Sequence, residues 1–185
     1  MLFHRLEMKL RAILLALCAV SAAPAATLIQ LSMDQMTRQA TAIVRAKVTG
    51  STTSQTGSTI YTHYALQVTD TLKGTAPSEV ALPGGVANGY RQSFPGVPQL
   101  QTGAEYVLFL WQSPSTGIIH ILGLNQGLFN VSAQSDGSVL VARGRIGETM
   151  LDTSGNVVQD HAIQMTLSAL KQQVSQNLPP AAPPQ

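Results

Sequence analysis

The chain has 185 residues, of which 11 are Lys or Arg and 9 are Asp or Glu, and this length suits one domain with a sizeable core. Three of the basic residues and one acidic residue precede residue 12, so the rest of the chain is formally neutral with eight of each. This balance excludes an electrostatic basis for nucleic acid or an anionic membrane as the partner.

The first 26 residues are predicted to form a signal peptide that directs export. Arg5, Lys9 and Arg11 precede an apolar run over residues 12–22. Ala23-Pro24-Ala25 then supplies the small residues that signal peptidase accepts. Cleavage near Ala25 or Ala26 predicts a periplasmic or extracellular protein, and it leaves membrane contact only to the signal segment of the precursor.

Two other interpretations of this segment remain open, and so does the position of the start. A retained membrane anchor needs about 20 apolar residues, which is more than the run contains. A lipoprotein would use Cys18, but Leu17 stands where the lipoprotein signal needs a small residue. Translation can start at Met1 or at Met8. Because Cys18 is the single cysteine, the cleaved chain has none, and its core must hold it together without disulfides.

After the signal, the pattern predicts a short helix and then strands. Ser32 can cap the helix with Gln35 at the capping-box position, and the helix is expected to end near Ala40. The following strand has Val44, Ala46 and Val48 on one face, which is the alternation of a half-buried strand.

Residues 51–58 are predicted to be a polar linker that leads into a second, longer strand. That strand places Ile60, Tyr64 and Leu66 on one face, with Tyr61 and His63 on the wet face. Strands with one wet face each are typical of an antiparallel sheet. A short third strand is expected over residues 79–82.

Residues 83–103 are predicted to form a long loop, because they hold five glycines and three prolines without a sustained period. Loops of this length in a compact domain are often functional. Tyr90, Arg91 and Phe94 are therefore the candidate partner-binding residues, since aromatic and arginine side chains dominate interface energies. The alternative is an inert loop whose aromatic side chains plug the end of a barrel.

The apolar run over residues 106–111 predicts a strand that is buried on both faces and forms the centre of the core. Further strands are expected over residues 118–122, 128–132 and 139–142, with a tight turn at Asp136-Gly137. Another turn is expected at Ser154-Gly155-Asn156, in a small hairpin.

A final helix is predicted to begin at Asp160 as its cap, with Ile163, Leu167, Leu170 and Val174 on one apolar stripe. The Pro-rich residues 177–185 are predicted to be a disordered tail, because proline cannot continue a helix. With no repeat or change of composition, residues 27–176 are predicted to form a single β-rich domain.

The sequence contains no recognisable catalytic motif, so no catalytic, cofactor-binding or metal-binding residue is predicted. His63, His120 and His161 are separated in the sequence and are expected to be hydrogen-bonded or solvated rather than zinc ligands. Arg143 and Arg145, at the end of the last main strand, are expected to be solvated.

Several segments together carry a resemblance: residues 31–34 leading into Ala42–Val48, residues 64–68 leading into Leu72-Lys73-Gly74, Pro83-Gly84-Gly85, and Gly103–Leu110. Over roughly residues 28–132 the pattern resembles a group of uncharacterised secreted bacterial domains. More remotely, it is similar to netrin-like domains, including the inhibitory domain of tissue metalloproteinase inhibitors, which implies an OB-type barrel. That family inhibits through a mature N-terminal cysteine, which this chain lacks.

These observations predict a mainly β fold, an antiparallel OB-like barrel or sandwich with a short N-terminal helix and a C-terminal amphipathic helix. The expected function is that of an exported, non-enzymatic binding module for an unknown protein or cell-surface ligand. Three alternatives stay open: a secreted peptidase inhibitor that uses residues 83–103 as its wedge, an enzyme of unrecognised class, and a passive structural component of the envelope.

Overall fold

The structure is a computed structural model that describes residues 26–178, and its longest feature is a hairpin of two 15-residue strands. β2 (Ala42–Thr56) and β3 (Thr59–Lys73) pair antiparallel up to a turn at Gly57-Ser58. Three register shifts in β2, between Ile43 and Gly50, bend this hairpin, as bulges do. The predicted signal peptide lies outside the described residues, as does almost all of the predicted tail.

The predicted polar linker at residues 51–58 is wrong, because β2 continues to Thr56 and pairs residue by residue with β3. Its threonines are β-branched and suit a strand, but no apolar residue marks either face. Gly57 makes the turn with φ at 60°. We call residues 51–56 and 59–65 the arm.

Eight strands form the main sheet, in the order β13-β10-β9-β7-β2-β3-β4, with β8 paired to β7 beside this path. The remaining strands of the main sheet are β4 (Glu79–Pro83), β7 (Glu105–Gln112), β8 (Ile119–Ile121), β9 (Leu128–Ala133), β10 (Val139–Arg143) and β13 (Ile163–Thr166). The prediction of a mainly β fold with an antiparallel sheet and flanking helices is confirmed. Among residues 26–178, no ladder joins the edge strands β13 and β4, so the hydrogen bonds of this sheet do not form a closed barrel.

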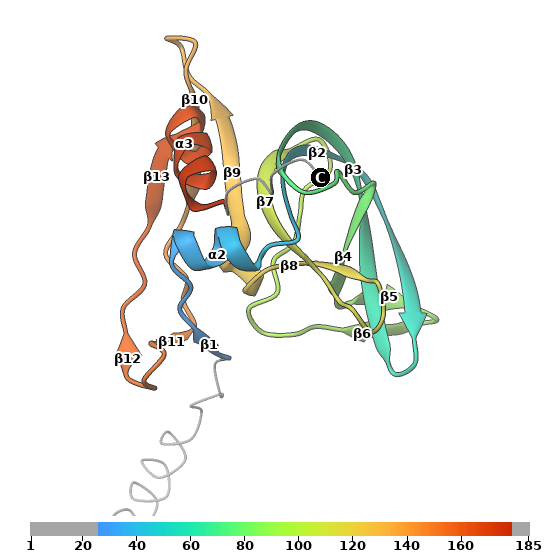
Figure 1. Cartoon of the computed structure of the whole chain (residues 1–185). Coiled ribbons are helices and arrows are strands. Elements are labelled where there is room, and N and C mark those ends of the chain that lie inside the picture. Colours follow the sequence, from blue (N-terminus) through green and yellow to red (C-terminus); the bar gives the residue numbers. More distant parts are fainter. Residues whose placement is uncertain (1–25, 179–185) are drawn as a thin grey trace, which may run out of the picture.

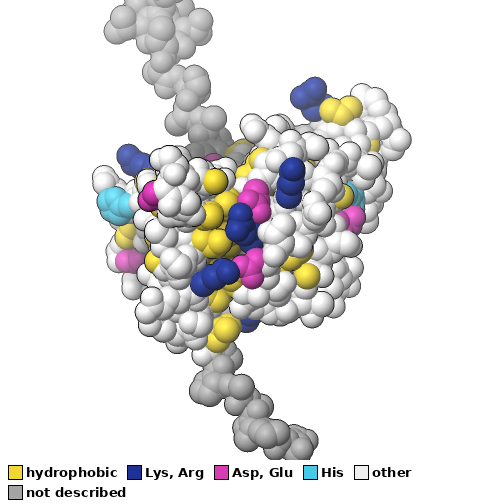
Figure 2. Space-filling model, turned by 90° about the horizontal axis from the view of Figure 1, so that it is seen from above, with side chains coloured by type: hydrophobic (Ala, Val, Ile, Leu, Met, Phe, Trp, Pro, Cys, Tyr) yellow, Lys and Arg dark blue, Asp and Glu magenta, His cyan; other side chains and the backbone are white. Residues whose placement is uncertain are grey.

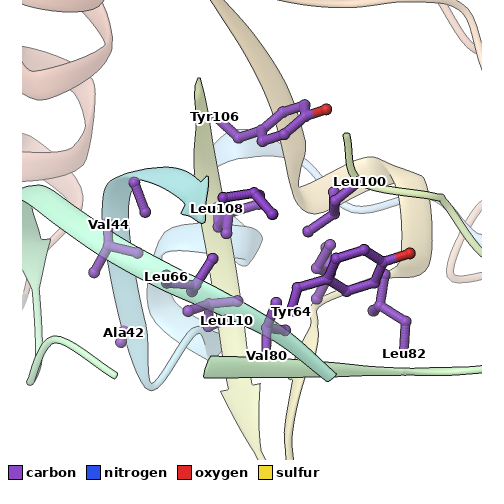
Figure 3. Packing of buried hydrophobic residues seen from close by; sticks show 13 residues of the cluster. Ala42, Val44, Tyr64, Leu66, Val80, Leu82, Leu100, Tyr106, Leu108 and Leu110 are labelled. Carbon is purple, nitrogen blue, oxygen red and sulfur yellow. The ribbon is translucent and has the colours of Figure 1, made fainter. Parts of the chain in front are cut away.

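The sheet separates two hydrophobic clusters, and β7 contributes to both, as the apolar run predicted. On one face, β2, β3, β4, β7 and β8 curl around the first cluster, which Figure 3 shows from close by. It contains Ala42, Val44, Ala46, Val48, Tyr64, Leu66, Val80, Leu82, Leu100, Tyr106, Leu108, Leu110 and Ile121. We call this face the inner face of the sheet, and the opposite one the outer face.

Two helices cover the outer face at the other end of the sheet, where α2 (Met33–Gln39) and α3 (Leu167–Asn177) lie over β9, β10 and β13 (Figure 1). Their side chains pack with the strands around Phe109 and Phe129, whose ring centroids are 5.8 Å apart. Ser32 caps α2 in a capping box with Gln35, as predicted, because each side chain bonds the backbone N–H of the other residue.

The last helix begins later than predicted. Thr166 is its N-cap and accepts a hydrogen bond from the backbone N–H of Ala169, while Ile163 lies in strand β13. The apolar stripe of Leu167, Leu170 and Val174 is buried as expected. Asp160, predicted as the cap, instead lies in the segment before β13.

Two small sheets complete the fold. β1 (Thr27–Ile29), β11 (Thr149–Leu151) and β12 (Val157–Val158) form one of them, in which β1 and β11 are parallel. β5 (Gly85–Ala87) and β6 (Tyr90–Gln92) form the other, and a 3₁₀ helix, η1 (Leu124–Gly127), precedes β9. Within residues 26–178, no helix is long and apolar enough to cross a membrane.

Charged side chains of opposite sign lie next to one another over the face shown in Figure 2. Lys171 pairs with Asp70, and Arg45 Nη2 lies 2.8 Å from Glu105 Oε2. The hydrogen bond from Arg45, ahead of any other cause, lowers the pKa of Glu105 below its ordinary value. On this face, the described residues therefore show charges of both signs side by side rather than a concentration of one sign.

Candidate functional site

The predicted loop 83–103 contains the β5–β6 hairpin, which lies against the inner face of the arm. Its turn is Asn88-Gly89, with φ at 53° and 77°, the positive values that a two-residue hairpin turn of this kind requires. Gly85 allows the close approach, because a Cβ there would lie 2.6 Å from Thr62 Oγ1. The part of the loop nearest the arm is therefore an ordered element.

Side-chain hydrogen bonds fix the hairpin to both strands of the arm. Gln92 Oε1 accepts from the backbone N–H of Ile60 at 2.7 Å, and Gln92 Nε2 donates to Ser58 O at 2.7 Å. Thr53 Oγ1 donates to Val86 O at 2.7 Å, and Thr62 Oγ1 donates to Gly84 O at 2.8 Å. A partner that binds here meets a surface that is already ordered, which lowers the entropic cost of binding.

Tyr90, Arg91 and Phe94 are all exposed, but they do not share one surface. Tyr90 is 73% exposed and Phe94 is 42% exposed. Successive side chains of a strand point to opposite faces, so Tyr90 and Arg91 leave β6 on opposite sides. Arg91 pairs across the hairpin with Val86, which is also exposed.

Phe94 contributes to a small hollow at the end of the curled sheet. The hollow has a volume of about 90 Å³, and Tyr64, Leu82 and Val97 also line it. This is well below the roughly 300 Å³ at which ligand pockets begin. Phe94 thus partly covers the end of the first cluster while keeping much of its ring in solvent.

On the outer face of the arm, the structure brings together Ser54, His63 and Glu79 from three neighbouring strands. Ser54 Oγ lies 2.8 Å from His63 Nε2, and His63 Nδ1 lies 3.1 Å from Glu79 Oε1. The histidine side chain is 24% exposed and the glutamate side chain is 58% exposed. The prediction that His63 lies on the wet face is confirmed, but Ser54 and Glu79 were not among the predicted site residues.

Sequence reasoning missed this cluster because residues 51–58 were expected to be a linker. A two-residue turn at Gly57-Ser58 would have set Ser54 opposite Tyr61 and Thr52 opposite His63, which makes Ser54 and His63 diagonal neighbours. The place of Glu79 depends on the register between β3 and β4, which the intervening loop does not encode.

An aromatic group lies on the same face, where β4 and β8 meet without a ladder between them. His120 Nδ1 is 2.9 Å from Ala81 O and so links the two strands. The His120 ring stacks on Trp111 with centroids 6.5 Å apart, and the Tyr61 ring lies tilted to it with centroids 6.1 Å apart. Trp111 is 38% exposed, so part of this group faces solvent.

The prediction that Arg143 is solvated is wrong, because Arg143 forms a buried ion pair. Its Nη2 lies 2.7 Å from Asp160 Oδ1, and the two residues are only 7% and 5% exposed. Asp160 Oδ2 also accepts from the backbone N–H of Ile146 at 2.7 Å, and Arg143 donates to His161 O. These bonds hold the segment between β10 and β13 in place, so we assign the pair a structural role.

The turn at Asp152–Asn156 is an ordinary side-chain-bonded turn, in which Asp152 Oδ1 accepts from two backbone N–H groups. Among residues 26–178, no three His, Cys, Asp or Glu side chains gather where they could hold one metal ion.

No protein-family model, curated protein or solved structure matches this chain. The resemblance to netrin-like domains therefore stays a prediction.

Proposed function

We propose that this chain is an exported binding module whose contact surface is the β5–β6 hairpin. The observation that carries the proposal is Tyr90, a large side chain that is 73% exposed on a hairpin anchored to both strands of the arm. Exposed aromatic residues on rigid elements are the usual anchors of protein interfaces, because they bury a large area at low entropic cost. The partner is a protein or a cell-surface ligand.

Capture from the medium or envelope of the producing cells tests this proposal. Tyr90→Ala should weaken capture by at least tenfold, about 1.4 kcal/mol, and should leave the melting temperature within a few degrees. Arg91→Ala and Phe94→Ala show which side of the hairpin the partner uses. Val157→Ala is the matched control, because Val157 is also 73% exposed but lies on β12.

Unchanged capture by the triple variant of Tyr90, Arg91 and Phe94, with an intact fold, would place the contact surface elsewhere. The outer face around Tyr61 and Trp111 would then be the next surface to test. If the captured partner is a peptidase, the binding function is inhibition, with the hairpin as the wedge.

A further inference from the structure

We propose that Ser54, His63 and Glu79 form a nucleophilic site in which Ser54 takes the acyl group of small activated esters. This inference goes beyond binding, and it departs from the sequence-based expectation that the chain is not an enzyme. It rests on contacts on the outer face of the arm. The proposed binding surface, the β5–β6 hairpin, lies against the inner face of the arm.

The order of the contacts is the one that nucleophilic catalysis by serine requires. A base must contact the hydroxyl, and a third group must orient the base. Here His63 Nε2 lies 2.8 Å from Ser54 Oγ, and Nδ1 lies 3.1 Å from Glu79 Oε1. An ionised carboxylate can only accept, so Nδ1 carries the hydrogen and Nε2 is left to receive the serine proton.

The backbone holds these three side chains in register. Ser54, His63 and Glu79 belong to β2, β3 and β4, which are adjacent in the main sheet. Ser54 pairs with Tyr61, and Glu79 pairs with Ala65, so each flanks His63 diagonally across a ladder. A site on paired strands is held more precisely than one on a loop.

The open edge of the arm supplies donors beside the nucleophile. Ile60 directs its N–H and C=O toward the β4 side, to Gln92 Oε1 and the Gly84 N–H, so Tyr61 directs its own toward β2. The backbone N–H and C=O of its partner Ser54 therefore point toward β3. The backbone N–H groups of the flanking residues 53 and 55 point away from β3.

No described strand pairs with β2 at this edge, because the ladder to β7 ends at Lys47 and Glu105. The backbone N–H groups of Thr53 and Gln55 are thus free of ladder bonds on both sides of Ser54. Such donors can stabilise the negative oxygen that forms when a serine attacks a carbonyl carbon. Because Ser54 Oγ contacts His63 on β3, they serve here only if the acyl group extends over the open edge of β2.

The chemistry balances with an ester and water as reactants. Ser54 Oγ forms a bond to the carbonyl carbon as His63 Nε2 takes the hydroxyl proton, and the carbonyl π electrons move to its oxygen. The bond to the leaving alcohol then breaks, and the imidazolium returns the proton to that alcohol. Water attacks the acyl-serine with the same base, which releases the acid and restores Ser54.

Exposure limits the substrates to esters with good leaving groups. Ser54 is exposed and the Glu79 side chain is 58% exposed, so water screens the charges that would stabilise the transition state. A site without an enclosed, preorganised oxyanion hole loses about 10²–10³ in rate. The expected substrates are therefore aryl esters and thioesters, and peptide amides are excluded.

The test treats the full chain with p-nitrophenyl acetate and locates acetyl groups by mass spectrometry of its peptides. We expect acetyl on Ser54, and no acetyl at this position in Ser54→Ala. His63→Ala should slow acetylation of Ser54 by at least tenfold, which is less than the roughly 10²–10⁴-fold of an enclosed general base because this site is exposed. Ser51→Ala is the matched control, because it removes a hydroxyl from the other face of β2 and should leave the rate unchanged.

Two results would overturn the proposal: acetyl groups only on residues other than Ser54, or a His63→Ala rate within tenfold of the native rate. An unchanged rate in Glu79→Gln would show that Glu79 does not orient His63 for this reaction. All these side chains are partly or fully exposed, so each variant should melt within a few degrees of the native chain. A fluorophosphonate that labels Ser54 in the native chain, but not in His63→Ala, gives a second readout.

Discussion

Arg143 and Asp160 form a buried ion pair, although the sequence around each residue predicts a different role for it. Arginines at the end of a strand are usually solvated, and an aspartate before an apolar stripe is usually a helix cap. The structure pairs them because the segment with β11 and β12 leaves β10 and returns beside it. This contact is invisible in the local pattern, since 17 positions separate the two residues.

Removal of one partner should be costly, because the other would remain buried with an uncompensated charge. We expect Asp160→Ala to lower the free energy of unfolding by about 3–5 kcal/mol in a urea titration. Asp34→Ala is the matched control. It breaks the exposed ion pair of Asp34 with Arg38 on α2, and it should cost less than about 0.5 kcal/mol. Equal losses in the two variants would contradict the structural role of the buried pair.

At the level of elements, strands with an apolar face were the most predictable part of the fold. The strands around Val44, Leu66 and Phe109 follow from alternation or from an uninterrupted apolar run. The arm was missed because Ser51–Thr56 is exposed on both faces and carries no apolar period. The start of α3 was missed because Ile163 continues the helical stripe by coincidence, while its backbone is part of β13.

The buried strand β7 gives the sharpest test of the core. Phe109 is fully buried and contacts Phe129 in the second cluster. Phe109→Ala should lower the free energy of unfolding by about 3–5 kcal/mol, from the lost burial and the cavity left behind. Trp111→Ala, two residues further on the same strand and face, is the comparison, and it should cost clearly less because Trp111 is 38% exposed. A change below about 1 kcal/mol for Phe109→Ala would show that this strand is not the core.

At the level of the whole molecule, the sequence predicts the fold class but not the neighbours of each strand. Nothing in the local pattern pairs β2 with β7 or sets β4 beside β8, because those contacts depend on how long loops return. The candidate sites share this limit. Tyr90 was visible as an aromatic residue in a Gly-rich loop, whereas the cluster of Ser54, His63 and Glu79 exists only once three strands are in register.

Export is the prediction that concerns the whole chain, and it rests on the segment before the described residues. Protein recovered from outside the cytoplasm should begin at Ala26, or at Thr27 if the cut follows Ala26. N-terminal sequencing measures this directly. An intact precursor in the membrane fraction would instead support the retained-anchor interpretation.

The pairing of β1 with β11 has a consequence for synthesis of the chain on the ribosome. Thr27 lies opposite Thr149, so the start of the described chain finds its partner only near the end. Likewise, the second edge of β2 pairs with β7 and stays unpaired until β7 has been made. Proteins dominated by such distant contacts fold slowly, and their incomplete chains expose apolar strands that chaperones bind. The β1–β11 pairing therefore cannot form until residue 151 has been made, and the strands before it stay open to chaperones until their own partners follow.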